Sequence, residues 1–475
     1  MLIRGAEVSG VLCDVRIAGT RIAEMGQLAQ RAGEPLIEAG GGALLPGLHD
    51  HHIHLAATAA RRASIPCGPP GVMSSEAFVR SLQVPGSGWL RGTGFHESVL
   101  GGTLPDACML DRIVADRPVR IQHATGRMWL LNSLALEKLL AAAPPPPGLE
   151  RKHGRFTGRL FDEDAWLQKA LGSVPPDFMD VSAELARYGV TGITDMSPAN
   201  GTVMARHFTG QVEAGRLLQS VVLAGSPALS QAPQEHWRIG PLKLHLHEAA
   251  LPDFDVALAL VQSARAQGRT VAVHCVTEVE LVFALALLEA GEARRGDRIE
   301  HVSVASPDLV ERMARLGLAA CVQPHFIAER GERYLAEVDA RHIPDLYRVN
   351  TLIEAGIAVA GGSDAPYGSV DPWAAMAAAL RRMTSNGTVV GAGEAISPEA
   401  ALDLYLADPL DFRRIRRVAP GEPADLCLLA QPWSRARQRL DSSDVAATIA
   451  KGRLIHQAVD QSPFERLPRA DAAAG

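Results

Sequence analysis

The stretch PGLHDHHIH, residues 46–54, places four histidines within six positions at the end of a short apolar segment. Side chains two apart on a strand point to the same side, so His52 and His54 are predicted to face the interior of a sheet together. His49 and His51 have the opposite parity and are expected to face helices or solvent. Two imidazoles at this spacing form a ready metal chelate. A histidine-rich turn without function is the alternative.

Seven further apolar segments follow this stretch, and helical patterns separate them. Such an alternation is typical of a parallel α/β sheet. Eight strands, most of them continuously apolar, favour a closed (β/α)₈ TIM barrel over an open doubly wound sheet, which is the alternative. We expect the barrel domain over 47–405. Its predicted strands are 43–55, 190–197, 218–225, 241–247, 270–275, 298–304, 319–324 and 358–364.

About 135 residues separate the first two predicted strands, far more than a normal crossover connection. This stretch contains its own strand-like pieces and the proline run 144–147. We predict a long insertion after the first barrel strand, at about 64–180, that covers the barrel mouth and shapes a pocket.

Both ends of the chain have short β segments punctuated by glycine. Neither end has enough strands for a stable sheet alone, so residues 1–46 and 406–460 are predicted to form one small composite β-sandwich. The tail 461–475 is predicted to be disordered.

The net charge of −6 argues against broad binding to nucleic acid or to an anionic membrane. The six cysteines show no CxxC spacing, as expected for reduced thiols. The N-terminus has no signal-peptide pattern, and no apolar run reaches the length of about 18 residues that a membrane span needs. We therefore expect a soluble cytoplasmic protein with a small-molecule substrate. A homodimer is only the base-rate expectation for its oligomeric state.

Two more histidines stand at the ends of successive predicted strands, His274 in VAVHC and His301 in RIEHVSV. Each alone is more often a structural residue than a ligand. Active sites of (β/α)₈ barrels gather at the carboxyl ends of the strands, so these imidazoles are expected to converge with the first pair. Three or four converging histidines suit zinc or a similar metal.

A carboxylate and a lysine complete the predicted site. Asp364 ends the last strand in AVAGGSD, where it can take a proton from a metal-activated water and deliver it to a leaving group. A turn or N-cap aspartate is the alternative. Lys243, in PLKLHLH, is costly inside a barrel unless it is neutralised or paired. Its parity matches that of His245 and His247, which are alternative ligands, and a lysine reaching solvent is the simpler interpretation.

The ordered set of segments resembles the amidohydrolase superfamily, and more narrowly the YtcJ-like metal-dependent hydrolases, including the N-substituted formamide deformylase-like subgroup. The resemblance covers about residues 40–430, and the insertion resembles the substrate-side segment of this subgroup. It implies that His52, His54, His274 and His301 are metal ligands and that Asp364 is the general acid/base. It further implies a carboxylated Lys243 that bridges two metal ions.

The resemblance implies a metal-dependent amidohydrolase that cleaves a C–N bond in an amide, formamide or cyclic amide with one or two Zn²⁺ ions. Another divalent metal fits the same ligands. A single-metal site stays open, because the run after Lys243 lacks the Asp-Gly-containing stretch that many relatives have. A deaminase of a heterocyclic amine is the main alternative, and a non-catalytic binding protein is the second. The substrate-binding candidates, for which ordinary loop packing is the alternative, are His123, Arg127, Trp129, His325 and Tyr367.

Overall fold

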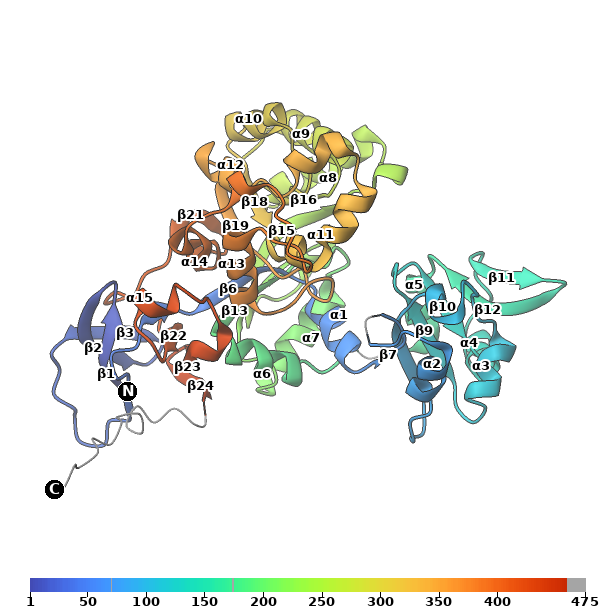
Figure 1. Cartoon of the computed structure of the whole chain (residues 1–475), viewed down its shortest axis with the longest axis horizontal. Coiled ribbons are helices and arrows are strands. Elements are labelled where there is room, and N and C mark those ends of the chain that lie inside the picture. The colour runs from blue at the N-terminus through green and yellow to red at the C-terminus, as the bar shows by residue number, and fades with distance from the viewer. Residues whose placement is uncertain (70, 173–174, 459–475) are drawn as a thin grey trace, which may run out of the picture. The chain divides into compact units, whose positions relative to one another are not determined.

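A computed structural model describes residues 1–69, 71–172 and 175–458 (Figure 1). The chain divides into two compact units, one made of Met1–Leu55 and the chain from Asp177 onward, the other of Ala56–Pro176. The predicted tail 461–475 lies outside the described residues. Among the described residues, no helix has both the length and the apolar character needed to cross a membrane.

The first unit contains a parallel eight-stranded sheet whose strands follow one another in chain order. Helices connect the strands, so the predicted (β/α)₈ barrel is confirmed. The strands are β6 (Leu48–Ile53), β13 (Val190–Asp195), β14 (Ser220–Gly225), β15 (Trp237–His245), β16 (Val271–Cys275), β17 (Arg298–His301), β18 (Ala319–Val322) and β19 (Ala358–Gly361). The helices of this part are α6 (Met179–Arg187), α7 (Thr202–Glu213), α8 (Phe254–Ala266), α9 (Glu278–Ala290), α10 (Pro307–Arg315), α11 (His325–Glu337), α12 (Val349–Glu354), α13 (Pro372–Arg381) and α14 (Pro398–Leu406).

The predicted strand 43–55 is in fact two strands in different sheets. Its first part, β5 (Leu44–Pro46), pairs with β22 (Leu426–Leu429), whereas β6 pairs with β13 in the barrel. Gly47 separates them where a Cβ atom would lie 2.2 Å from the Thr191 hydroxyl oxygen, so only glycine fits this crossing between sheets. An apolar run cannot show such a change of partner, because both pieces are buried strands.

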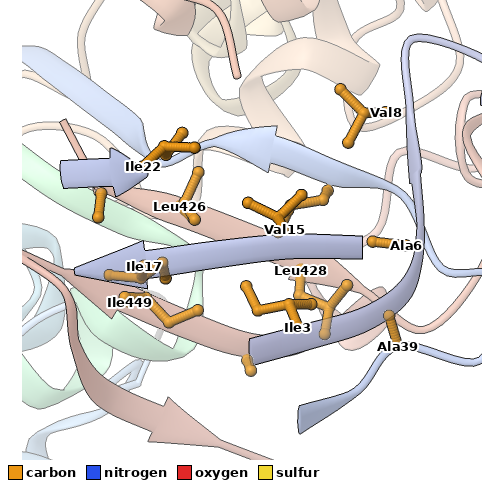
Figure 2. Packing of buried hydrophobic residues seen from close by; sticks show 13 residues of the cluster. Ile3, Ala6, Val8, Val15, Ile17, Ile22, Ala39, Leu426, Leu428 and Ile449 are labelled. Atoms are coloured by element: carbon orange, nitrogen blue, oxygen red, sulfur yellow. The ribbon is translucent and has the colours of Figure 1, made fainter. Parts of the chain in front are cut away.

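Both ends of the chain build a small β-sandwich beside this barrel sheet (Figure 1). One sheet has the order β3-β2-β1-β4 and the other β24-β23-β22-β5. The apolar side chains of both meet in one core, in which Ile3 and Val15 lie close to Leu428 and Ile449 (Figure 2). The remaining strands of the sandwich are β1 (Leu2–Val8), β2 (Val11–Ala18), β3 (Arg21–Gly26), β4 (Leu36–Glu38), β23 (Val445–Ala450) and β24 (Arg453–Gln457).

The second unit is a six-stranded sheet with helices against both faces. Alternate residues of β10 enter two different cores, Met128 and Leu130 one, Trp129 and Leu131 the other. The strands, in spatial order, are β11 (Leu149–Lys152), β12 (Arg155–Phe161), β10 (Met128–Leu131), β9 (Val119–His123), β8 (Leu90–Phe95) and β7 (Ile65–Pro66). The helices are α1 (Leu55–Arg62), α2 (Ser75–Leu82), α3 (Ala107–Ile113), α4 (Ser133–Ala142) and α5 (Asp164–Leu171). The fold therefore contains the predicted long insertion after the first barrel strand, while the predicted domain boundaries and the covering role of the insertion stay predictions.

Candidate metal centre

Two histidines from the first barrel strand meet the aspartate that follows the last one. Oδ1 of Asp364 lies 3.4 Å from Nε2 of His52 and 3.3 Å from Nε2 of His54. One donor atom from each residue lies within 4.8 Å of the others, a spacing that a single metal ion can bridge. His52 is fully buried, whereas His54 and Asp364 keep a small exposed area. The structure thus brings these three predicted residues together at the carboxyl ends of the strands.

The other two predicted histidines extend this cluster along the neighbouring strand ends. The His301 ring lies 4.7 Å from the His52 ring, and the His274 ring lies 4.5 Å from the His301 ring. His245, one of the alternative ligands on β15, is exposed and stacks 4.3 Å from His274. Five imidazoles therefore form a continuous arc of ring contacts from β6 to β15.

Lys243 is buried on β15, and its Nζ has no hydrogen-bond partner among the described residues. Nε2 of His52 is also buried and makes no hydrogen bond, although Oδ1 of Asp364 lies 3.4 Å away. An unsatisfied buried polar atom costs about 1–3 kcal/mol, so two of them at one place need an explanation. Imidazole nitrogens and carboxylate oxygens, with a lysine that can be converted to a carbamate, form a donor set that a divalent ion such as zinc accepts. The residues present fit a metal centre.

Burial gives these side chains the protonation states that metal ligands need. Desolvation lowers the pKa of His52, His274 and His301 below the usual histidine range, which favours neutral imidazoles. Desolvation also lowers the pKa of Lys243. Burial alone would raise the pKa of Asp364, but the neighbouring His301 and a hydrogen bond from His54 outweigh it and bring this pKa below its usual range. Asp364 is therefore a carboxylate.

Two supporting contacts were not predicted from the sequence. Nδ1 of His52 lies 2.5 Å from Oε2 of Glu300, and Arg298 donates to the other oxygen of that carboxylate at 2.6 Å. Nδ1 of His301 lies 2.8 Å from Oε1 of Gln323. Such contacts fix the ring orientation and direct the opposite Nε2 toward the site. The signal for them was the charged pair in the RIEH strand, where Arg298 and Glu300 interrupt an apolar run.

The backbone turns sharply where two of the predicted site residues lie. His301 has φ = 72° and Asp364 has φ = 50°, both in the left-handed region that residues other than glycine rarely adopt. Outliers of this kind concentrate at functional sites, where the surrounding structure holds them. For Asp364, the backbone N–H donates to the carbonyl oxygen of His52 at 2.7 Å, which ties the end of β19 to β6.

His49 and His51 lie on the other side of β6 and are buried. Nε2 of His49 is 2.9 Å from the Thr194 hydroxyl oxygen, and the His51 ring packs against Phe412 at 4.9 Å. Both rings therefore face away from the His52–His54 pair and toward packed protein.

The five substrate-binding candidates fall into two groups. His325 is buried, with Nε2 3.0 Å from the Ser363 carbonyl oxygen, while Tyr367 is exposed and lies 6.0 Å from the His54 ring. The other three lie in the inserted unit and have acidic partners there. His123 pairs with Glu97 at 2.9 Å, Arg127 makes two 2.7 Å bonds to Asp162, and Trp129 donates to Asp164 at 2.9 Å. Their predicted contact with substrate stays a prediction.

Comparison with known proteins gives consistent matches over most of the chain. A family model described as "Amidohydrolase family" matches residues 36–456. "Putative amidohydrolase YtcJ" of Bacillus subtilis is 25% identical over 501 residues, covering 91% of this chain and 93% of that protein. "N-substituted formamide deformylase" of Arthrobacter pascens is 24% identical over 466 residues, covering 83% and 85%.

A solved structure shares the fold. The crystal structure of an uncharacterized metal-dependent hydrolase from Pyrococcus furiosus superposes with a TM-score of 0.73 at 22% identity, covering 90% of this chain and 98% of that one. The predicted family resemblance is confirmed.

Proposed function

Because the chain belongs to the amidohydrolase family, it is a hydrolase, and we propose that it cleaves the C–N bond of an amide, formamide or cyclic amide. The observation that supports this proposal is the approach of Asp364 to both His52 and His54 at the barrel mouth. A relative named for formamide deformylation supports the substrate class.

We assign the metal-holding role to His52, His54, Lys243, His274 and His301, with zinc as the expected ion. When bound, such an ion polarises the substrate carbonyl and lowers the pKa of a water molecule toward neutrality. Carboxylation of Lys243 joins its amine nitrogen to carbon dioxide with release of a proton, and the resulting carbamate would supply anionic oxygen ligands to the metal. The buried, unpartnered Nζ and its lowered pKa support this step, because only the neutral amine is nucleophilic.

Asp364 is placed to move the proton that hydrolysis requires. Its carboxylate accepts a proton from the attacking water as the oxygen–carbon bond forms at the carbonyl. It then donates this proton to the leaving nitrogen as the C–N bond breaks, and an acid and an amine result. The 3.3 Å distance between its Oδ1 and Nε2 of His54 keeps the carboxylate beside the proposed ligands.

The test combines metal quantitation with a screen of N-acyl, N-formyl and cyclic amide compounds. Asp364→Asn should keep the metal content of the wild type and lower kcat/KM by about 10³-fold, within the range of general acid–base catalysis. Asp339→Asn, at the exposed N-cap of the 3₁₀ helix Ala340–Asp345, is the matched control and should leave kcat/KM unchanged.

Near-full activity of Asp364→Asn would remove Asp364 from the mechanism. Release of ammonia from heterocyclic amines, with no turnover of amides, would replace the proposal with the deaminase alternative. A purified protein without stoichiometric metal and without turnover of either class would favour a binding protein.

A further inference from the structure

A pair of half-buried charges lies on the sheet of the inserted unit. Arg91 on β8 and Arg120 on β9 are register partners on neighbouring parallel strands. Both guanidinium groups lie over the ring of Trp129 on β10, with their central carbons 5.7 and 5.9 Å from its centroid. Arg120 also lies 5.7 Å from the Trp89 ring. Both guanidinium groups therefore make cation–π contacts with the same Trp129 ring.

Neither guanidinium has a hydrogen bond or an ion pair within the described parts of the chain, and the Nε atom of each is buried without a partner. Asp164, whose charge acts on Arg91, accepts a hydrogen bond from the indole N–H of Trp129 at 2.9 Å. Other arginines of this unit differ, because Arg127 holds Asp162 with two bonds and Arg159 pairs with Glu150. Among the half-buried arginines of this unit that the structure describes, Arg91 and Arg120 thus lack the partners that Arg117 and Arg159 have.

Electrostatics make the pair unfavourable in the absence of a counter-charge. Burial lowers the pKa of Arg91, and burial together with the charge of Arg91 lowers the pKa of Arg120 to about 10. Cation–π contact offsets part of this cost, but it neutralises no charge. Both side chains keep part of their surface exposed, so a solute can reach them.

We propose that Arg91 and Arg120 form an oxyanion site in the inserted unit, which binds the carboxylate or phosphate group of a small molecule above Trp129. Guanidinium groups present planar pairs of N–H donors that match both anions, and two of them supply the charge for one or two negative charges. The inference does not depend on the proposed hydrolase function, since it uses no residue of the barrel.

The test uses the full chain, with inorganic phosphate and acetate as probes. Calorimetric titration should detect binding of at least one of the two anions, accompanied by a change in indole fluorescence that Trp129→Phe abolishes. Arg91→Gln and Arg120→Gln should each weaken this binding at least tenfold. Arg151→Gln is the matched control, because Arg151 lies 4.1 Å over a single ring, that of Phe156, and its loss should change binding less than twofold.

A stability measurement separates a lost anion site from a folding defect. In buffer without phosphate or acetate, Arg120→Gln should raise the melting temperature, because it relieves the repulsion from Arg91. With the binding anion present, the wild type should gain stability and the variant should not. The inference is overturned if neither anion binds, if both variants bind like the wild type, or if Arg120→Gln is destabilised equally with and without anion.

Discussion

Two buried regions of the first unit differ in what burial does for the protein. In the sandwich core, apolar side chains from both chain ends pack against one another (Figure 2), and each buried apolar Å² stabilises the fold by about 25 cal/mol. At the barrel mouth, burial encloses Lys243, His52 and Asp364. There, unpartnered polar atoms cost free energy instead. Burial therefore stabilises the sandwich, whereas at the barrel mouth it leaves polar atoms whose cost needs an offsetting partner.

The largest expected effect comes from Lys243→Met, which should move activity and stability in opposite directions. Loss of the proposed ligand should lower kcat/KM by about 10³-fold, beyond the 10- to 100-fold typical of residues that only contact a ligand. In the presence of a metal chelator, the free energy of unfolding of the variant should exceed that of the wild type by about 1–3 kcal/mol, because the substitution removes a buried amine that has no hydrogen-bond partner. Denaturant unfolding measures this difference.

Lys138→Met, on an exposed face of α4, is the control and should change neither quantity. A carbamate signal in carbon-13 NMR of protein exposed to labelled bicarbonate should be present in the control and absent from Lys243→Met. Equal activity of wild type and Lys243→Met would refute the assignment of this lysine.

The opposite pattern is expected in the sandwich. Ile449 on β23 is fully buried against strands from the other end of the chain. Ile449→Ala should lower the free energy of unfolding by about 2–5 kcal/mol and leave kcat/KM of the folded enzyme unchanged at 25 °C. Leu454→Ala, at a partly exposed position on β24, should change stability by about 0.5 kcal/mol or less. A large activity loss in Ile449→Ala without a stability change would undo the distinction between the two regions.

The sequence predicted the features that depend on the order of neighbouring residues, namely the barrel strands and the side of the first strand that each histidine faces. The alternation in β6 separates His52 and His54 from His49 and His51, and continuous apolar runs locate the barrel strands. The partner of His52 was not predictable in this way. Glu300 and His301 are consecutive, so ideal strand alternation would place only one of them in the site; the left-handed turn at His301 accompanies the departure from this rule.

The pairing of strands that are distant in the sequence was also not predictable from the sequence. The split of 43–55 between two sheets depends on which strand each piece meets. The closeness of Arg91 and Arg120 depends on the register of β8 and β9, which no single segment encodes. Tertiary pairing, and not local preference, decides these features.

Glu300→Gln tests whether the carboxylate beside His52 supports metal binding at the barrel mouth, and its expected effect is intermediate in size. The amide keeps the shape of the side chain but loses the charge between Arg298 and the His52 ring. Metal affinity should fall by about 10- to 100-fold, the usual effect of removing a partner of a ligating histidine. Competition with a zinc chelator measures this loss, and Glu311→Gln, on an exposed helix surface, should bind metal like the wild type. Unchanged affinity in Glu300→Gln would mean that this carboxylate does not support the ligand.

The smallest expected effect concerns an ion pair in the sandwich, where the buried Arg16 has an acidic partner, unlike Lys243 at the barrel mouth. Glu34 accepts from the buried Arg16 guanidinium at 2.8 Å, and this bond, together with one from the Arg31 backbone N–H and the charge of Arg16, lowers the pKa of Glu34 from 4.5 to about 2. A lowered pKa means that the folded protein binds the proton less readily than the unfolded chain, so the stabilisation is complete above pH 4.5 and is lost as the pH falls toward 2. The difference in unfolding free energy between wild type and Glu34→Gln should therefore be constant near neutrality and shrink across that window, whereas Glu38→Gln, in an exposed pair, should show a weaker dependence. A difference that stays constant down to pH 2 would show that the Arg16 pair does not stabilise the sandwich through its charge, and the distinction between partnered and unpartnered buried charges would then rest on the barrel mouth alone.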